Sequence, residues 1–295
     1  MNSDALIARA RITEGLQALP RHELKRLWAD LGYIILPAAP EWHDRPETAL
    51  QTERLIAAIA ASLAEDFASV PALAKVSGTT IECIVRDFYE LAPNSPVNAK
   101  KGGNGFNGCL QVYAVARVMQ PKVIIESGVF RGQTTWVLRQ ACPKASIFCF
   151  DPVLDALVYK DRDAIYSASD WSEFDLSALP VEEALAFFDD HMDQGRRILE
   201  AQARGIKTLL FDDNAPASRI HTVGGPPIPS LDRLMDESLD GEDLAWTYRG
   251  RRYECQIEKA RAIEVRNAVA TLRNFADMHR VTGYTPARIT CVSLR

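Results

Sequence analysis

The stretch VIIESGVFRGQTTWVLRQACPKASIFCFDP, residues 123–152, holds two short apolar runs that each end in an acidic residue. Glu126 lies at the end of the first run and Asp151 directly follows the second, with a glycine-bearing turn and a helix-like segment between them. Short, continuously apolar runs are typical of parallel strands that are buried on both faces. The stretch therefore predicts a strand–helix–strand unit.

The same rhythm continues toward the C-terminus. Further apolar runs, DAIYSA, LAFFDD and KTLLFDD, begin at residues 163, 185 and 207. Residues 191–205 between the last two predict a helix that stops at Gly205, because glycine is favoured just past a helix C-terminus. Repeated strand–helix units predict an α/β fold with a doubly wound, mostly parallel sheet.

The segment before this unit has a different pattern. Residues 1–97 carry apolar positions at helical spacing, and they predict an N-terminal helical extension that acts as a cap or an oligomerisation surface. The glycine-rich residues 98–108 then begin the main domain, which is expected to span residues 98–295. Residues 100–108 are also expected to help enclose the binding pocket, because their glycines can act as hinges.

The segment after the last apolar run is rich in proline and glycine. Residues 215–255 are predicted to form a lid over the site, because insertions that follow a ligand-bearing strand are well placed to cover it. Within it, TYRGRRYEC predicts a hairpin that turns at Gly250. Residues 257–278 predict one long helix, and ARITCVSLR, residues 287–295, predicts a closing strand.

Composition excludes several classes of protein. The 295-residue chain has a formal net charge of -5 and no basic block, which disfavours a nucleic-acid partner. Its six cysteines are scattered and form no C-x-x-C pair, so reduced and mostly buried thiols are expected. The longest apolar run is too short to cross a bilayer, and the first residues lack a signal-peptide core. These features predict a cytoplasmic protein that acts on a small molecule.

The glycine turn indicates the kind of ligand. In parallel α/β sheets, ligands bind outside the carboxyl ends of the strands, where helix N-termini offer free N–H groups. Gly128 and Gly132 follow the first strand, and Asp151 at the end of the second is placed to accept hydrogen bonds from a ribose. This arrangement predicts a nucleoside. Phe130 stands where a dinucleotide fingerprint requires its second glycine, so NAD and FAD fit poorly.

These residues resemble the first motif of class I S-adenosylmethionine-dependent methyltransferases. The resemblance covers about residues 123–214 and implies a Rossmann-like S-adenosylmethionine-binding domain. It implies that Gly128 and Gly132 line the amino-acid part of the cofactor and that Asp151 binds the ribose hydroxyls. Glu126 would lie near the ammonium group, and Thr134 in the same turn is a further candidate for cofactor contact.

The turn after the third strand is expected to face the adenine. Asp170 would accept a hydrogen bond from the adenine amino group, and Trp171 would pack on the ring. The alternative is that Asp170 caps a helix and Trp171 belongs to the core.

Two pairs of acids end the fourth and fifth strands. They are Asp189 and Asp190, then Asp212 and Asp213, with Asn214 next. Carboxylates gathered at one sheet edge repel each other unless a cation neutralises them. The pattern resembles the metal site of catechol and macrocin O-methyltransferases, which implies Mg²⁺ held by Asp189, Asp212 and Asp213, with Asp190 as the alternative to Asp189. The alternative is that one acid of each pair caps a helix.

His191 directly follows the first pair and is a candidate catalytic residue together with Asp190. An imidazole titrates near neutrality, so His191 could take a proton from the acceptor, although a first-turn or metal-ligating role stays open. The resulting hypothesis is methyl transfer from S-adenosylmethionine to a hydroxyl of a sugar or a natural-product intermediate, assisted by Mg²⁺. The alternatives are metal-independent transfer with His191 as base, N-methylation, and a non-catalytic or other nucleotide-binding Rossmann-like protein.

Overall fold

The computed structural model describes residues 49–97, 103–214, 228–248 and 251–295, together with the helical residues Glu23, Arg26 and Asp30. The chain divides into two compact units, Met1–Ala39 and Pro40–Arg295. The second unit contains the sheet and the candidate site, and the account below concerns this unit.

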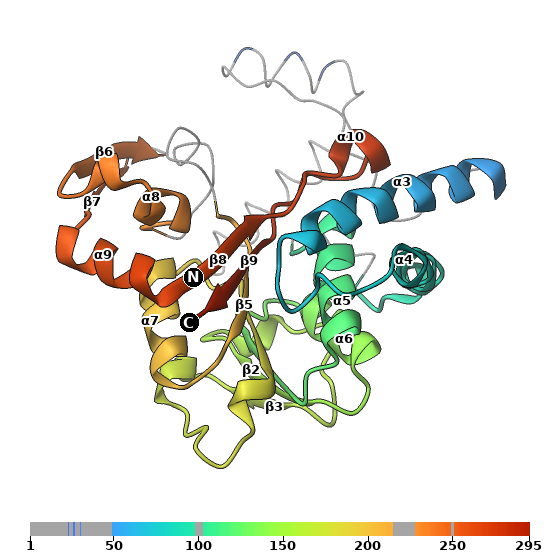
Figure 1. The fold of residues 1–295 in the computed structure, drawn as a ribbon, viewed down its shortest axis with the longest axis horizontal. Helices are drawn as coiled ribbons and strands as arrows, with labels where there is room; N and C mark the ends of the chain where they lie inside the picture. Colours follow the sequence, from blue (N-terminus) through green and yellow to red (C-terminus); the bar gives the residue numbers. More distant parts are fainter. Residues whose placement is uncertain are drawn as a thin grey trace. The chain divides into compact units, whose positions relative to one another are not determined.

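A mostly parallel sheet forms the centre of the second unit (Figure 1). Its described strands number seven, in the spatial order β3-β2-β1-β4-β5-β9-β8. Their bounds are β1 Val123–Ser127, β2 Ser146–Phe150, β3 Ile165–Ser167, β4 Ala184–Phe188, β5 Thr208–Phe211, β8 Val269–Asn274 and β9 Thr290–Leu294.

The first five strands run parallel, and β9 is antiparallel to both β5 and β8. The order 3-2-1-4-5 is that of the doubly wound, Rossmann-like sheets, in which the strand order reverses beside β1. All five residues of β1 and of β4 are buried, as expected for strands covered on both faces. The structure confirms the predicted doubly wound, mostly parallel α/β fold.

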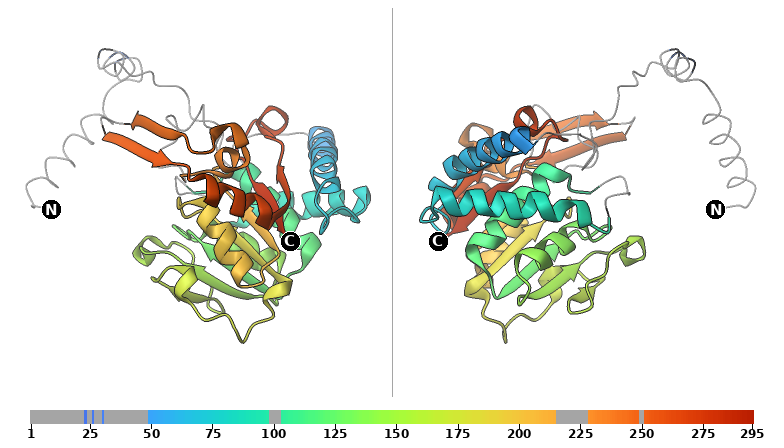
Figure 2. Two further views of the ribbon diagram at one scale, coloured as in Figure 1. Left: turned by 60° about the vertical axis from the view of Figure 1, so that its left-hand side comes forward. Right: turned by 90° about the vertical axis from the view of Figure 1, so that its right-hand side faces the viewer.

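Helices cover both faces of the sheet (Figures 1 and 2). Helices α3 to α6 share a core with Ile124 and Ile147 on one face, whereas α7 to α9 pack with Ile125 and Phe148 on the other. Among the described residues, none of the helices combines the length and apolarity needed to cross a membrane. The helices are α3 Ala49–Ala68, α4 Gly78–Leu91, α5 Phe106–Met119, α6 Gln133–Ala141, α7 Gln194–Ala203, α8 Leu231–Met235, α9 Lys259–Ala268 and α10 His279–Thr282. The short 3-10 helices are η1 Ala92–Asn94, η2 Leu154–Ala156, η3 Trp171–Glu173, η4 Val181–Glu183 and η6 Glu237–Leu239.

Helices α3 and α4 belong with the sheet. Their buried residues, including Phe67 and Phe88, join the core that also contains α5 and α6. The boundary between compact units falls after Ala39, so it does not coincide with the one expected after residue 97. The oligomerisation role of the N-terminal segment stays a prediction.

The helix predicted over residues 257–278 is wrong in its second half. Helix α9 ends at Ala268, and residues 269–274 form strand β8, which pairs with β9. The apolar positions Val269 and Leu272 suited a helical face, but the β-branched Val269 and Thr271 also favour a strand. Pairing with β9 decides the outcome. Without β8, the strand β9 would be the edge of the sheet, and backbone groups along it would lack partners.

The predicted hairpin is present as a separate two-stranded sheet, β6 Asp243–Tyr248 with β7 Arg251–Gln256 (Figure 2). Trp246 and Tyr253 stack across it, with ring centroids 5.2 Å apart. Residues 215–227 and the expected turn residue Gly250 lie outside the described residues.

All six cysteines lie in described segments, and all are free. Those at positions 109, 142, 149 and 291 are buried, whereas Cys255 is partly exposed and Cys83 is exposed. The expectation of reduced, mostly buried thiols is confirmed.

Two glycines allow the turn after β1 to approach other backbone segments. Gly128 has φ of 92°, and a Cβ atom there would lie 2.2 Å from the Asp189 carbonyl oxygen. Gly132 has φ of 83°, and a Cβ atom would lie 2.2 Å from the Tyr159 carbonyl oxygen. The turn therefore requires glycine at both positions, for conformation and for space.

We expect Gly128→Ala to lower the free energy of unfolding by about 3 kcal/mol or more, because the added methyl group collides with backbone that cannot move aside. Gly241→Ala is the matched control, since Gly241 also has a positive φ of 81° but nothing lies within 4 Å of its Cβ position. Its cost should be only the conformational strain, about 1–2 kcal/mol. Urea unfolding measures both, and equal costs would contradict the role of close approach.

Candidate functional site

A cavity of about 660 Å³ opens at the carboxyl ends of the parallel strands. This volume falls within the ~300–1,000 Å³ typical of small-molecule sites. The residues around it come from the turns after β1, β2, β4 and β5, from the segment before α5 and from the segment before β9. They are Gly103, Asn104, Gly105, Gly128, Phe130, Asp151, Pro152, Asp189, Asp190, His191, Asp212, Asp213, Asn214, Thr285, Pro286, Ala287 and Arg288.

Asp151 lines the cavity and holds the glycine turn in place. Its Oδ2 accepts hydrogen bonds from the backbone N–H groups of Val129 and Phe130, at 2.9 and 2.8 Å. Its Oδ1 accepts one from Val153 at 2.8 Å. The residue therefore organises the turn, and its predicted contact with a ribose stays a prediction.

Glu126 lies beneath the turn and is fully buried. Its Oε2 accepts hydrogen bonds from Thr135 Oγ1 at 2.5 Å and from the Cys149 thiol at 3.5 Å, while Oε1 has no partner among the described residues. Burial raises the pKa of Glu126 to about 8, so the carboxyl is mostly protonated at neutral pH. Neither Glu126 nor the buried Thr134 is among the residues that line the cavity. Their predicted cofactor contacts stay predictions.

Asp190 lines the cavity, but both of its carboxylate oxygens are engaged. Oδ2 accepts from Ser127 Oγ at 2.7 Å and from Arg197 Nε at 2.8 Å, and Oδ1 accepts from the Met192 N–H at 3.1 Å. The side chain of Arg197 is only 2% exposed, so this is a buried ion pair that neutralises one acid of the first pair. This geometry favours a structural role for Asp190 over the catalytic role expected for it.

Asp170 and Trp171 lie apart from the residues that line the cavity. Asp170 receives two hydrogen bonds from Arg197, at 2.9 and 2.8 Å, and caps η3 by accepting from the Ser172 N–H. Trp171 is fully buried and packs on Phe188, with ring centroids 5.4 Å apart. This geometry favours the alternative for the two residues, a helix cap and a core side chain.

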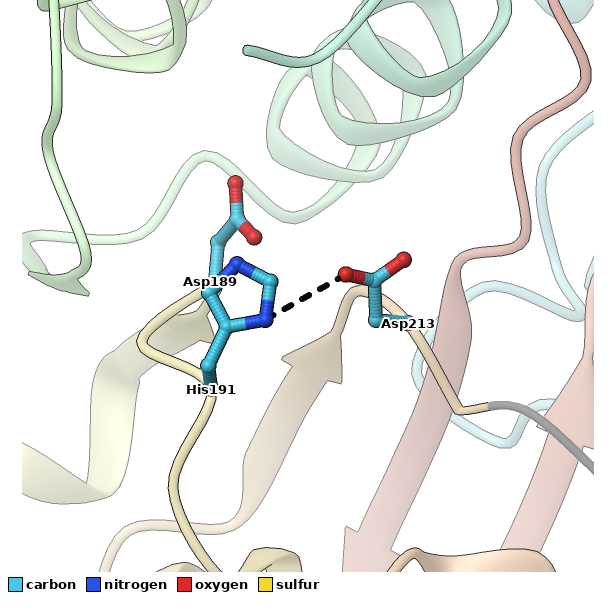
Figure 3. Close-up of side chains that lie close together, drawn as sticks. All are labelled: Asp189, His191 and Asp213. Atoms are coloured by element: carbon cyan, nitrogen blue, oxygen red, sulfur yellow. Dashed lines mark ion pairs between the residues drawn. The ribbon is translucent and has the colours of Figure 1, made fainter. Parts of the chain in front are cut away.

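Asp189, His191 and Asp213 form the chemically distinctive part of the cavity. Each of Asp189, His191 and Asp213 offers one ligand atom, and these atoms all lie within 4.8 Å of one another. Figure 3 shows the three side chains at the neighbouring ends of β4 and β5, where His191 Nδ1 lies 3.5 Å from Asp213 Oδ2. His191 and Asp213 both have positive φ, 53° and 56°, a conformation that costs energy for residues other than glycine. The backbone is strained where these two side chains meet.

Mutual repulsion shapes the electrostatics of this cluster. Burial, followed by the charge of Asp212, raises the pKa of Asp189 well above its usual range. Burial, followed by the charge of Asp213, raises the pKa of Asp212 to about 7. Asp189 and Asp212 are half-buried as residues, and their carboxylate groups are the parts most shielded from water. A proton or a cation would relieve this repulsion.

Asp212, predicted as a metal ligand, is not part of the three-residue cluster. Its Oδ1 accepts a hydrogen bond from the Asp213 N–H at 2.8 Å, which helps to set the conformation of that residue. The side chain of Asn214 is also engaged: its Oδ1 accepts from the Asp232 N–H at 2.9 Å, and its Nδ2 donates to Thr290 Oγ1 at 3.1 Å. The structure therefore brings together only part of the expected donor set.

Several residues that line the cavity were not among the predicted site residues. Phe130, an exposed residue, and Pro152 belong to the two motifs already described, and Phe130 stood out as a departure from the dinucleotide pattern. Residues 103–105 belong to the glycine-rich segment that was expected to enclose the site. Residues 285–288 carry no local signal, because only the path of the chain toward β9 brings them to the cavity.

No protein-family model matches the chain, and no curated protein matches it. Among solved structures, it is similar to the O-methyltransferase from Bacillus cereus in complex with SAH, at 10% identity and a TM-score of 0.40, over 79% of this chain and 97% of that one. It is similar to the SAH-bound Podospora anserina methyltransferase PaMTH1 at 12% identity and a TM-score of 0.37, over 85% and 98%. It is also similar to an apo structure of CmcI, at 16% identity and a TM-score of 0.29. That match covers 34% of this chain and 49% of the CmcI chain, so this chain spans about half the length of CmcI. Identities and TM-scores this low leave the function of this chain to be judged from its own residues.

The buried Glu126 predicts a specific pH dependence of stability. Its pKa is raised from 4.5 to about 8 on folding, so the folded state binds a proton that the unfolded state releases between those values. This contribution to stability is complete below about pH 4.5 and is lost as the pH rises through about 8. In that window, Glu126 should contribute a fall of about 1.4 kcal/mol per pH unit in the free energy of unfolding.

Glu126→Gln should remove this slope, because the amide does not titrate. Glu182→Gln, which changes an exposed side chain, is the control and should keep the wild-type slope. Chemical unfolding at pH 5, 6, 7 and 8 measures all three proteins. Parallel curves for wild type and Glu126→Gln would contradict the prediction.

Proposed function

We propose that this protein is an S-adenosylmethionine-dependent methyltransferase that methylates a hydroxyl group of a small molecule. The observation that carries the proposal is that the glycine turn closed by Asp151 and the cluster of Asp189, His191 and Asp213 face one cavity. A nucleoside-binding turn and a group that can activate a hydroxyl are thus within reach of the same bound molecules.

The residues beside the turn fit a nucleoside cofactor. Asp151 accepts three backbone hydrogen bonds, and a carboxylate has roughly four positions at which it can accept, so a ribose hydroxyl can still donate to it. Phe130 and Pro152 add apolar surface to the same cavity. When bound, S-adenosylmethionine supplies a methyl group on a sulfonium sulfur, which an oxygen nucleophile displaces in one step.

The three-residue cluster fits a divalent cation. It offers two carboxylates and one imidazole, and the Asp189 carboxylate makes no hydrogen bond with any described residue. Oxygen ligands suit Mg²⁺, and the imidazole extends the suitable ions to Mn²⁺ and its neighbours. When bound, the cation would polarise acceptor hydroxyls and lower their pKa.

The chain itself would contribute position and proton transfer. The ends of β4 and β5 fix Asp189 and Asp213 at the cavity, so the acceptor oxygen would be held in the same cavity as the glycine turn. His191 is exposed, and a ring nitrogen that does not hold the cation would take the proton that the hydroxyl loses.

A second candidate mechanism uses no metal. The His191–Asp213 pair, at 3.5 Å, resembles a general base with an orienting carboxylate, which is sufficient to activate a hydroxyl without a cation. In that case EDTA leaves turnover unchanged, and His191→Gln lowers it by about 10²–10⁴-fold.

The cofactor proposal predicts that S-adenosylhomocysteine binds in the micromolar range, about -7 to -8 kcal/mol. Asp151→Asn should weaken binding by roughly 1.5–3 kcal/mol, because hydrogen bonds to a charged acceptor are lost. Asp155→Asn, an exposed position four residues away, is the matched control and should bind as wild type does. Isothermal calorimetry measures the three affinities. Absence of binding to the wild type would overturn the cofactor proposal.

The metal proposal predicts which aspartates matter. Asp189→Asn and Asp213→Asn should each weaken Mn²⁺ binding by about 10–100-fold, because each removes a charged ligand. Asp212→Asn should have a smaller effect, since Asp212 lies outside the cluster. Calorimetric titration of metal-free protein with MnCl₂ and MgCl₂ provides the measurement, with Asp155→Asn as control. If the wild type binds neither ion, the metal proposal is overturned and the second candidate mechanism takes its place.

A further inference from the structure

Arg288 is a cation in an acidic cavity. The described lining includes five aspartates, at positions 151, 189, 190, 212 and 213, and Arg288 is its only residue with a guanidinium or ammonium group. The side chain is partly buried. Even so, no hydrogen bond or ion pair joins Arg288 to another described residue. A guanidinium that lines a cavity and has no partner among the described residues can bind a ligand there.

The backbone that carries Arg288 is firmly held. The buried Asn107 side chain donates to the Thr285 carbonyl at 2.9 Å, and it accepts from Thr282 Oγ1 at 2.9 Å. The rings of Phe106 and Tyr284 stack with centroids 4.5 Å apart. On the other side of Arg288, Ile289 is fully buried in the core. The guanidinium therefore extends from a fixed wall, which favours recognition over a merely solvated charge.

We propose that Arg288 binds a carboxylate group of a molecule held in this cavity. A planar guanidinium forms two parallel hydrogen bonds with a planar carboxylate, a match that ammonium groups lack. The surrounding aspartates repel anions, so an acidic ligand needs a local positive charge of this kind to enter. The identity of the ligand rests on the proposed function, which offers two sources: the amino-acid carboxylate of the cofactor, or an acidic group on the acceptor.

The test compares full-length wild type with Arg288→Gln, Arg288→Lys and the control Arg280→Gln. Arg280 is exposed on α10 and lies outside the cavity lining. Two pairs of probes are titrated by calorimetry in the presence of Mn²⁺. S-adenosylhomocysteine is paired with 5′-methylthioadenosine, which lacks the amino-acid carboxylate, and 3,4-dihydroxybenzoate is paired with catechol, which lacks the acid.

If the carboxylate is that of the cofactor, Arg288→Gln should weaken S-adenosylhomocysteine about 10–100-fold and leave 5′-methylthioadenosine unchanged. If it belongs to the acceptor, the same loss should appear for 3,4-dihydroxybenzoate and not for catechol. Arg288→Lys should recover part of the loss, because charge returns without the two-pronged geometry. Arg280→Gln should match the wild type throughout.

The inference is overturned if neither acidic probe binds the wild type more tightly than Arg288→Gln, or if acidic and neutral probes lose affinity equally. The proposed function fails separately, when the wild type binds neither S-adenosylhomocysteine nor 5′-methylthioadenosine. In that case the second pair of probes still decides whether Arg288 recognises an acid. Thermal melting of each variant shows that it is folded, and a misfolded Arg288→Gln leaves Arg288→Lys to give the result.

Discussion

The approach of the β1 turn to the end of β4 is the constraint on which the rest of the site depends. Gly128 lies so close to the Asp189 carbonyl oxygen that no side chain fits between the two segments. The Asp189 N–H also donates to the Ser127 carbonyl oxygen, at 2.8 Å, so a backbone hydrogen bond joins the two strand ends. This junction brings the nucleoside-type turn and the first acid pair to one cavity. A side chain at position 128 would separate the parts that must act together.

Four of the acids that follow β3, β4 and β5 form two groups with different surroundings. Asp190 and Asp170 share the buried guanidinium of Arg197, and their charges are balanced within the protein. Asp189 and Asp213 have no such cation among the described residues, and they face the cavity beside His191. Because like charges at short range are costly, the second group is poised to accept a proton or a cation. Asp189 and Asp190 are adjacent in the sequence but have different surroundings, because only Asp190 pairs with Arg197 on α7.

Local sequence was sufficient for the central sheet, because a parallel strand buried on both faces needs a short apolar run and little else. It was insufficient where two patterns agree with the same residues: Val269 and Leu272 suit a helical face, and only pairing with β9 makes them a strand. The roles expected for Asp170 and Trp171 were drawn from position in the fold. In the structure, Asp170 pairs with the buried Arg197, which is distant in sequence, and Trp171 packs on Phe188. Residues 285–288 could not be anticipated, since their place depends on contacts with α5.

The first N–H groups of helix α8 are capped by side chains from distant parts of the chain. Gln194, at the start of α7, accepts from the Leu231 N–H at 2.8 Å, and Asn214, just after β5, accepts from the Asp232 N–H at 2.9 Å. The N–H groups of a first helical turn have no partner within their own helix. Helix α8 therefore takes its capping groups from two segments that directly follow the acid pairs, and a displacement of those segments would also disturb the start of this helix.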